Sequence, residues 1–263
     1  SEILQLEYNI LLNKSDQYEN NDLTSMYGRQ DNRMQETLDI TRSQKPQSLN
    51  QEFKLYFTLA DDHIFSFEAQ HLDQEENPFS RAIRDRNPFT RLIPFSSSVN
   101  KYDVTQERLV HTAKLEAKLD YYYLLNDTSN INLSLGVTDV GQDFDSSFFQ
   151  ILDNGSLLNF NDPTFNNDVS FDFSDAYIAL NYRLRTGIFT IDPGLTLHYY
   201  KTKNTQLGTS FERNISDVRP NLRINLQFKK SESLRLTYRK NTQFTDINNL
   251  AEGFVFSNYN SIF

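Results

Sequence analysis

The segment that decides the fold is Ala113-Lys-Leu-Glu-Ala-Lys-Leu-Asp-Tyr-Tyr-Tyr123, in which apolar residues occupy every second position. Successive side chains of a β-strand point to opposite faces, so this alternation predicts a strand with one apolar and one charged face. The helical pattern of apolar residues at i, i+3, i+4 and i+7 fails in this window. The length is close to the ~9–11 residues that a tilted strand needs to cross a bilayer.

The same alternation recurs along the chain and predicts about nine strands. The other eight segments are residues 4–12, 53–59, 65–69, 131–137, 176–184, 189–199, 218–228 and 234–238. The 21 Phe and 14 Tyr residues, against 8 Gly, also favour strands over helices. A local exception is Asn77-Pro78, which predicts the start of a short helix through Arg86 because Pro is favoured at the first helical position.

The connections between these segments alternate strictly between short and long. The short ones are residues 60–62, 126–130, 185–187 and 229–233, and the long ones are 13–50, 73–107, 139–175 and 201–217. Outer-membrane barrels have short periplasmic turns and longer extracellular loops. The pattern therefore predicts an all-β fold, an antiparallel up-and-down transmembrane β-barrel wall. Residues 1–263 are expected to form part of a single β-barrel domain.

The composition excludes several other classes of protein. The formal net charge of -9 disfavours a nucleic-acid binder, which needs a basic face. The absence of cysteine excludes disulfides and thiolate metal sites. No G-x-S-x-G, P-loop or G-x-G-x-x-G motif is present, so we predict no catalytic residues, no enzyme activity and no cofactor.

Two groups of residues are candidates for metal binding: the four His residues and the acidic stretch 139–175. The four His residues show no H-E-x-x-H spacing, and we predict solvated or interfacial imidazoles rather than a metal site. The acidic stretch 139–175 has no EF-hand spacing but leaves calcium binding open, because hard cations prefer clustered carboxylates.

Two architectures remain compatible with strands that have two different faces. A soluble β-sandwich on the cell surface, binding a ligand through its loops, buries its apolar faces against each other. A membrane barrel turns the apolar face toward lipid. Strand length and turn alternation favour the barrel, and clustered tyrosines predict an aromatic girdle at its interfaces. These tyrosines are Tyr121, Tyr122, Tyr123, Tyr199 and Tyr200.

Two stretches resemble the barrel portion of the TonB-dependent outer-membrane receptors of Bacteroidota, the outer-membrane β-barrel family. One is Leu234-Arg-Leu-Thr-Tyr238-Arg-Lys-Asn-Thr-Gln-Phe244-Thr-Asp-Ile247-Asn-Asn-Leu250, and the other is the amphipathic hairpin in residues 50–77. The resemblance implies a barrel of about 22 strands with an N-terminal plug and a TonB box. Neither plug nor box is visible, and no Gly-Asn-Pro turn follows Leu250. We therefore expect a piece of a larger barrel.

The resemblance also implies a function. It implies uptake of a nutrient, such as a glycan, a peptide or a siderophore-like compound, through the outer membrane. The expected partners are membrane lipid, TonB and a surface lipoprotein. Charged residues whose parity is opposite to that of the apolar rows are predicted to face the lumen, where they would tune selectivity. They are Lys114, Glu116, Lys118, Arg183, Arg223 and Arg235.

Overall fold

The computed structural model describes residues 3–27, 34–87, 93–160, 165–206, 208–243, 250, 253, 256–258 and 261–262. Its strands are β1 (Ile3–Lys14), β2 (Gln17–Tyr27), β3 (Met34–Gln44), β4 (Gln47–Ala60), β5 (His63–Glu76), β6 (Phe79–Arg84), β7 (Tyr102–Asn126), β8 (Ser129–Ile151), β9 (Leu157–Asn159), β10 (Asn167–Thr186), β11 (Phe189–Gln206), β12 (Thr209–Lys229), β13 (Glu232–Arg239), β14 (Phe256–Asn258) and β15 (Ser261–Ile262). Among the described residues, no helix is long and apolar enough to span a membrane.

The main sheet has 13 strands, and its path of neighbours is β1-β4-β5-β7-β8-β10-β11-β12-β13. Each of the nine alternating segments of the sequence lies in one of these strands. Every neighbouring pair is antiparallel. The predicted all-β, antiparallel, up-and-down fold is confirmed.

Three gaps of two residues each lie at the same level of the sheet. They separate β1 from β2, β3 from β4, and β5 from β6 along the chain. Two of the breaks contain Pro46 and Pro78, and proline has no backbone N–H for a sheet ladder. Side-chain and backbone groups bridge the breaks: Ser15 N–H donates to the Pro46 carbonyl at 3.1 Å, and Lys45 N–H donates to Asn77 Oδ1 at 2.8 Å. The pairing continues beyond the breaks as β2-β3-β6-β7.

Several predicted long connections are wrong because the strands extend through them. Residues 13–50 contain β2 and β3, and most of 139–175 belongs to β8 and β10. Between 201 and 217, only residues 207 and 208 separate β11 from β12, and Gly208 has a φ of 76°, which a tight turn requires. The short helix predicted from Asn77 is also wrong, since Phe79–Arg84 is β6 and pairs with β3 and β7.

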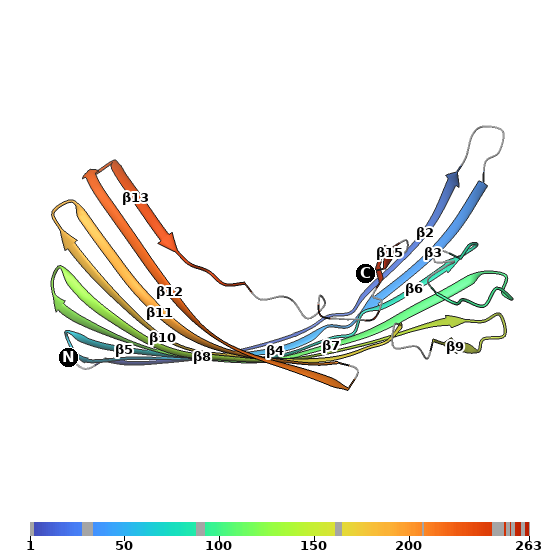
Figure 1. Cartoon of the computed structure of the whole chain (residues 1–263), viewed down its shortest axis with the longest axis horizontal. Coiled ribbons are helices and arrows are strands. Elements are labelled where there is room, and N and C mark those ends of the chain that lie inside the picture. Colours follow the sequence, from blue (N-terminus) through green and yellow to red (C-terminus); the bar gives the residue numbers. More distant parts are fainter. Residues whose placement is uncertain are drawn as a thin grey trace.

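The sheet curves into an open trough (Figure 1). The four predicted short turns are present between β4 and β5, β7 and β8, β10 and β11, and β12 and β13, and they lie together at one end of the trough. Residues 240–243, directly after β13, lie on the concave side, and the short pair β14-β15 lies on this side as well (Figure 1). The described residues do not form two large sheets packed face to face, so the soluble-sandwich alternative is not the architecture of this part of the chain.

Candidate functional site: the two faces of the sheet

Directly opposite residues of antiparallel strands share a face, and the register places apolar residues in continuous rows across the sheet. One row is Leu6, Leu55, Phe67, Leu119, Leu135, Ile178, Leu197 and Val218. The apolar face reaches β13 through the pairs Ile224–Leu236 and Leu226–Leu234. The face is uncovered: Leu6 is 65% exposed, Leu135 45% and Val218 51%. A contiguous apolar surface of this extent marks an interaction with a protein or a membrane.

The apolar rows form a band of limited height, which is measured best on β7. The band runs there from Ala113 to Tyr123. At ~3.3 Å per residue this is about 33 Å along the strand. At the ~45° tilt of barrel strands it is about 23 Å, close to the ~25 Å apolar band of outer-membrane barrels.

Above the band the two faces exchange their polarity. The row Val137, Ala176 and Tyr199 is followed on the same face by Asp139, Ser174 and Lys201. The next residues of this face on β8 are Gly141, Asp143 and Asp145. The opposite face of the same strands becomes apolar and buried. Its residues include Phe144 at 0% exposure and Val169 at 1%, with Val110 and Phe171 packed against them.

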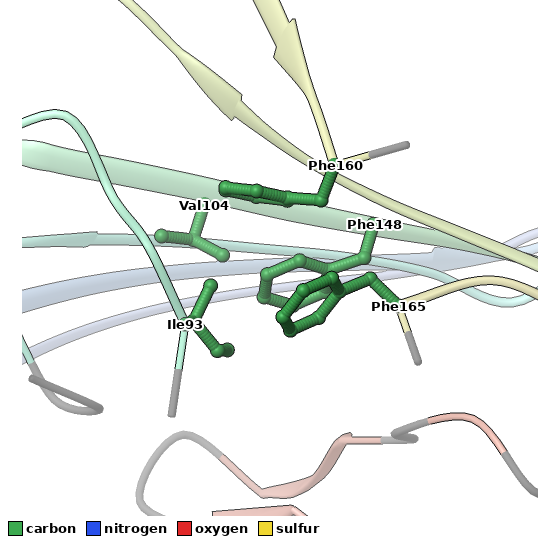
Figure 2. Close-up of a cluster of buried hydrophobic side chains, with 5 residues drawn as sticks. All are labelled: Ile93, Val104, Phe148, Phe160 and Phe165. Carbon is green, nitrogen blue, oxygen red and sulfur yellow. The ribbon is translucent and has the colours of Figure 1, made fainter. Parts of the chain in front are cut away.

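Loops pack against this upper apolar surface and form a small core (Figure 2). Ile93, Val104, Phe148, Phe160 and Phe165 are its buried members. The Phe160 ring lies 5.7 Å from Phe148 and 5.2 Å from Phe165, within the range of favourable aromatic pairs. The Gln150 side chain fixes the adjacent loop, because it accepts from Ser96 N–H at 2.8 Å and donates to the Ser96 carbonyl at 3.1 Å. These loops therefore pack on the sheet surface that is opposite to the acidic one.

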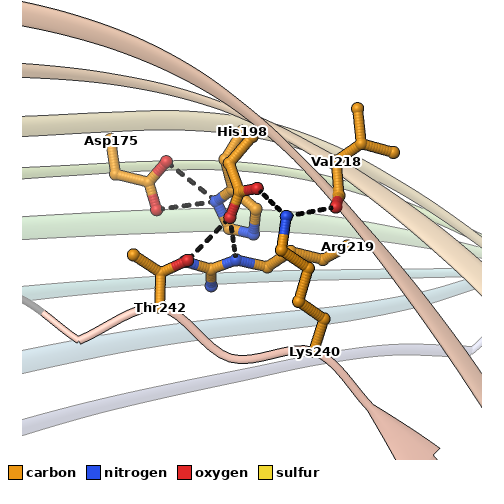
Figure 3. A network of polar contacts seen from close by, with 7 residues as sticks. Asp175, His198, Val218, Arg219, Lys240 and Thr242 are labelled. Carbon is orange, nitrogen blue, oxygen red and sulfur yellow. Dashed lines mark hydrogen bonds and ion pairs between the residues drawn. The ribbon is translucent and has the colours of Figure 1, made fainter.

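The polar rows lie on the concave face of the trough. Residues 240–243 lie on this side, and Lys240 and Thr242 both donate to Asp217 (Figures 1 and 3). Asp217 is opposite His198, and His198 is opposite Tyr177. The apolar band, which has the other parity, therefore covers the convex face.

The six charged residues that the sequence singled out all have the parity of this concave face. Lys114, Glu116 and Lys118 lie on β7, and Arg183 on β10. Arg223 and Arg235 lie on the neighbouring strands β12 and β13. The two groups do not pair with each other: Lys114 pairs with Glu116 at 2.8 Å and Lys118 with Asp120 at 2.7 Å. Arg183 is separated from β7 by β8, and Arg223 and Arg235 lie farther along the sheet.

A network of polar contacts occupies the middle of the concave face (Figure 3). Asp217 accepts from Arg219 Nε at 3.0 Å, from Thr242 Oγ1 at 2.7 Å and from Lys240 Nζ. His198 Nδ1 lies 2.9 and 3.0 Å from the two carboxylate oxygens of Asp175. The network ties the segment after β13 to the wall of the trough. The prediction of a solvated or interfacial imidazole is wrong for His198, whose side chain is 11% exposed and contacts Asp175 on the concave face.

Two glycines allow polar side chains to lie flat along the concave wall. A Cβ at Gly136 would be 2.2 Å from Cζ of Tyr177, so the Tyr177 ring lies across β8 at this point. A Cβ at Gly194 would be 2.1 Å from Oδ1 of Asn181. Asn221 reaches Asn181 across this gap in β11, with Nδ2 donating to Oδ1 at 3.4 Å. The absence of a Cβ at both glycines therefore leaves room for the side chains of Tyr177, Asn181 and Asn221 on the concave face.

A cavity of about 620 Å³ lies on the concave face and is lined by residues of β7, β8, β10, β11, β12 and β13. Its lining is rich in arginine and asparagine, and residues 240 and 241 border it. The lining includes Arg183, Arg219, Arg223, Arg239, Asn132, Asn181 and Asn221. Its size falls within the ~300–1,000 Å³ of small-molecule sites.

The predicted aromatic girdle is correct only in part. Tyr121 and Tyr123 lie on the convex face near the short turns, where His63 stacks on both with ring centroids 5.9 and 4.8 Å apart. Tyr122 and Tyr200 have the opposite parity and lie on the concave face. Tyr200 is 2% exposed, with the Arg219 guanidinium 5.4 Å from its ring centroid. Strand alternation therefore splits the clusters between the two faces.

The acidic stretch 139–175 is mostly strand, and five of its aspartates lie on the convex face above the band: Asp139, Asp143, Asp145, Asp168 and Asp172. Burial and the neighbouring charges of Asp168 and Asp143 raise the pKa of Asp145 above its ordinary value. Among the described residues, no three His, Asp or Glu side chains come together in a way that could hold a metal ion. Calcium binding in this stretch therefore gains no support from the geometry.

No protein-family model and no curated protein matches the chain. Among solved structures, it is similar to the ferric citrate transporter FecA, with 10% identity, a TM-score of 0.39, and coverage of 89% of this chain and 43% of that one. It is also similar to the siderophore receptor PiuA from Acinetobacter baumannii, with 9% identity, a TM-score of 0.38, and coverage of 89% and 48%. The toluene transporter TodX of Pseudomonas putida matches with 8% identity, a TM-score of 0.34, and coverage of 91% and 74%.

The chain spans less than half the length of FecA and PiuA. At this level of identity and superposition, the activities of these proteins do not transfer to the chain.

Proposed function

We propose that this chain forms part of the wall of a transporter barrel in the cell outer membrane. The observation that carries the proposal is the uncovered apolar band on the convex face. Its height of about 23 Å is close to the ~25 Å apolar band of outer-membrane barrels. At its upper border the convex face changes from apolar to acidic. In water, such a band would expose many large apolar side chains without a partner. In a bilayer it faces hydrocarbon, and the acidic rows above it lie in the aqueous region outside.

The edges of the sheet support a second part of the proposal. Among the described residues, β1 pairs only with β4, and β13 pairs only with β12, so each has one unpaired side. Unpaired backbone N–H and C=O groups cost several kcal/mol each in hydrocarbon, and spanning sheets are therefore closed rings. We propose that further strands complete the ring and that residues 1–263 are part of that single barrel domain.

In this arrangement the concave face lines the lumen. Lys114, Glu116, Lys118, Arg183, Arg223 and Arg235 would then contact the passing solute or a structure inside the barrel. The extended strands beyond the band, with the loops of the aromatic core, form the extracellular part that receives the ligand.

From the sequence resemblance, we further propose that the complete protein is a TonB-dependent receptor of Bacteroidota. It would take up a glycan, a peptide or a siderophore-like nutrient, with a plug domain, TonB and a surface lipoprotein as partners. Part of the supporting stretch, residues 244–249, lies outside the described residues.

The orientation of the strands in the membrane tests the proposal. The chain has no cysteine, so single-cysteine variants report one site each. A membrane-impermeant maleimide added to intact cells should label Asp143→Cys, which is exposed above the band, and should leave Asp127→Cys, in the short β7–β8 turn, unlabelled. After permeabilisation of the outer membrane, both should be labelled.

Labelling of Asp127→Cys in intact cells, or recovery of the protein in a soluble fraction, would contradict the proposal. Denaturation before labelling controls for reactivity, because both thiols must then react equally.

A further inference from the structure

The charges of the concave face are unevenly distributed between its two halves. Between the row of Asp217 and the row of Arg235, the concave surface of β10–β13 and the segment that follows carries seven cations and two carboxylates. The cations are Arg183, Arg185, Arg219, Arg223, Arg235, Arg239 and Lys240, and the carboxylates are Asp192 and Asp217. This cationic patch belongs to a chain whose net charge is -9. On β7, by contrast, the lysines alternate with Glu116 and Asp120 and pair with them.

The two carboxylates of the cationic patch are already engaged. Asp192 accepts from Arg183 Nε at 2.6 Å, and Asp217 is held by Arg219 and Lys240. Arg223 lies directly opposite Asp192 in the register but forms no ion pair with it. Within the described part of the chain, Arg223 and Arg239 have no carboxylate partner, and both are exposed toward the cavity.

One hydrogen-bond donor among the residues that line this cavity has no partner in the described part of the chain. The Asn132 side-chain nitrogen is buried and has no hydrogen-bond partner. A buried donor without a partner costs about 1–3 kcal/mol, which a ligand or a water molecule relieves. Asn181, Asn221 and Thr237 add amide and hydroxyl groups elsewhere in the cavity lining. The lining thus combines fork-shaped cationic donors with groups that suit an oxygen-rich solute.

We propose that this cavity binds a small solute bearing a carboxylate or a phosphate group, with Arg223 and Arg239 as the groups that hold the anion. Arginine matches the geometry of both oxyanions with two parallel N–H donors, and such charge-assisted bonds are among the strongest hydrogen bonds. The cavity volume of about 620 Å³ suits a small molecule rather than a folded acidic domain. The inference rests on the proposed function, since it assigns the substrate class of the lumen wall.

Calorimetric titration of the detergent-solubilised protein with inorganic pyrophosphate tests the site. The unsubstituted protein should bind pyrophosphate, and the affinity should fall as salt is raised. The double variant Arg223→Gln/Arg239→Gln should lose about tenfold or more in affinity. Arg223→Lys/Arg239→Lys, which keeps the charge and loses the fork, should fall between the two.

The matched control is Lys54→Gln/Lys229→Gln. It removes the same charge from residues outside the cavity that already form exposed ion pairs with Glu52 and Glu232. It should bind like the unsubstituted protein. Heat-modifiable gel migration and circular dichroism must be the same for all variants, so that a folding defect is not read as lost binding.

Three results would overturn the inference. The first is the absence of pyrophosphate binding by the unsubstituted protein. The second is an equal loss of affinity in Arg223→Gln/Arg239→Gln and in the control Lys54→Gln/Lys229→Gln. The third is binding of polyglutamate without binding of pyrophosphate. The last result would assign the patch to an acidic polypeptide inside the barrel. Failure of the proposed function looks different, because the protein would then not insert into lipid vesicles at all.

Discussion

Replacement of Ile178 by arginine separates a membrane wall from a water-exposed sheet. Ile178 lies in the middle of the convex band, directly opposite Leu135 on one side and Leu197 on the other. It is 43% exposed, and no described residue covers the row. If the band faces lipid, the guanidinium must enter hydrocarbon or reach back to the interface.

The expected cost follows from the depth of the position. An arginine on the lipid face of a barrel costs about 2–4 kcal/mol at the bilayer midplane and about 0–1 kcal/mol near the interfaces. At a position this exposed in water, the same substitution would change stability by only about ±0.5 kcal/mol. Ser174→Arg is the matched control, because Ser174 lies on the same face of the same strand, above the band.

The assay is reversible urea unfolding of the protein in phospholipid vesicles, followed by circular dichroism and gel migration. We expect Ile178→Arg to lower the free energy of unfolding by about 2–4 kcal/mol and Ser174→Arg by less than about 1 kcal/mol. Equal costs at the two positions would refute the assignment of the band to lipid.

Three further predictions concern the concave face and the upper part of the sheet. Gly136→Ala should destabilise the protein by about 1–3 kcal/mol, because its Cβ would be 2.2 Å from the Tyr177 ring; in urea unfolding the cost should vanish in the Tyr177→Ala background, and a cost that persists there would contradict the close contact. Glu36→Ala should cost about 3–5 kcal/mol by the same assay, since it removes the carboxylate that Arg84 contacts at 2.8 Å with both side chains under 10% exposed; an apolar pair, Glu36→Leu/Arg84→Met, should restore most of the loss, and failure to do so would argue against a simple buried pair. The Thr37 hydroxyl and N–H both donate to Asp85 and hold its pKa below the ordinary value, so this contact stabilises the fold above the unfolded pKa of about 3.9 and is lost as pH falls through the lowered folded pKa. Hydrogen exchange at the Thr37 amide should therefore be slower in the unsubstituted protein than in Asp85→Asn at pH 6. The difference should disappear at a pH below the lowered pKa of Asp85, and an equal difference at the two pH values would contradict this prediction.

The sequence predicted the lower half of the sheet correctly because one rule governs it. Between Ala113 and Tyr123, apolar and polar residues alternate in a fixed phase, and the partners of these residues on β5 and β8 keep the same phase. Period-two alternation is the direct sequence signal of a strand with two different environments. The parity of the six lumen candidates followed from the same rule.

The upper half was misread because the phase of the alternation inverts there. Asp139, Asp143 and Asp145 lie on the same face of β8 as Leu133 and Leu135, whereas Phe144 and Phe148 lie on the opposite face. A polar stretch with scattered aromatics is typical of a loop, and the inversion becomes visible only when the neighbouring strand is known. Residues 139–175 therefore looked like a connection.

The concave cavity and the network around Asp217 lay beyond the sequence for a different reason. Asp175, His198 and Asp217 come from three strands, and the register alone brings them into one row or into neighbouring rows. Lys240 and Thr242 reach Asp217 because residues 240–243 continue alongside β12 beyond the end of β13. Asn132, Asn181 and Asn221 carry no motif that would have linked them.

Quenching by spin-labelled lipids measures most directly which face of the sheet contacts hydrocarbon. A bimane fluorophore is attached to Leu135→Cys on the convex face or to Lys118→Cys on the concave face of the neighbouring strand, in vesicles with a doxyl group near the bilayer centre. We expect strong quenching at position 135 and little at position 118. Equal quenching at both positions, or protection of position 135, would show that the apolar band is covered by protein and not by lipid.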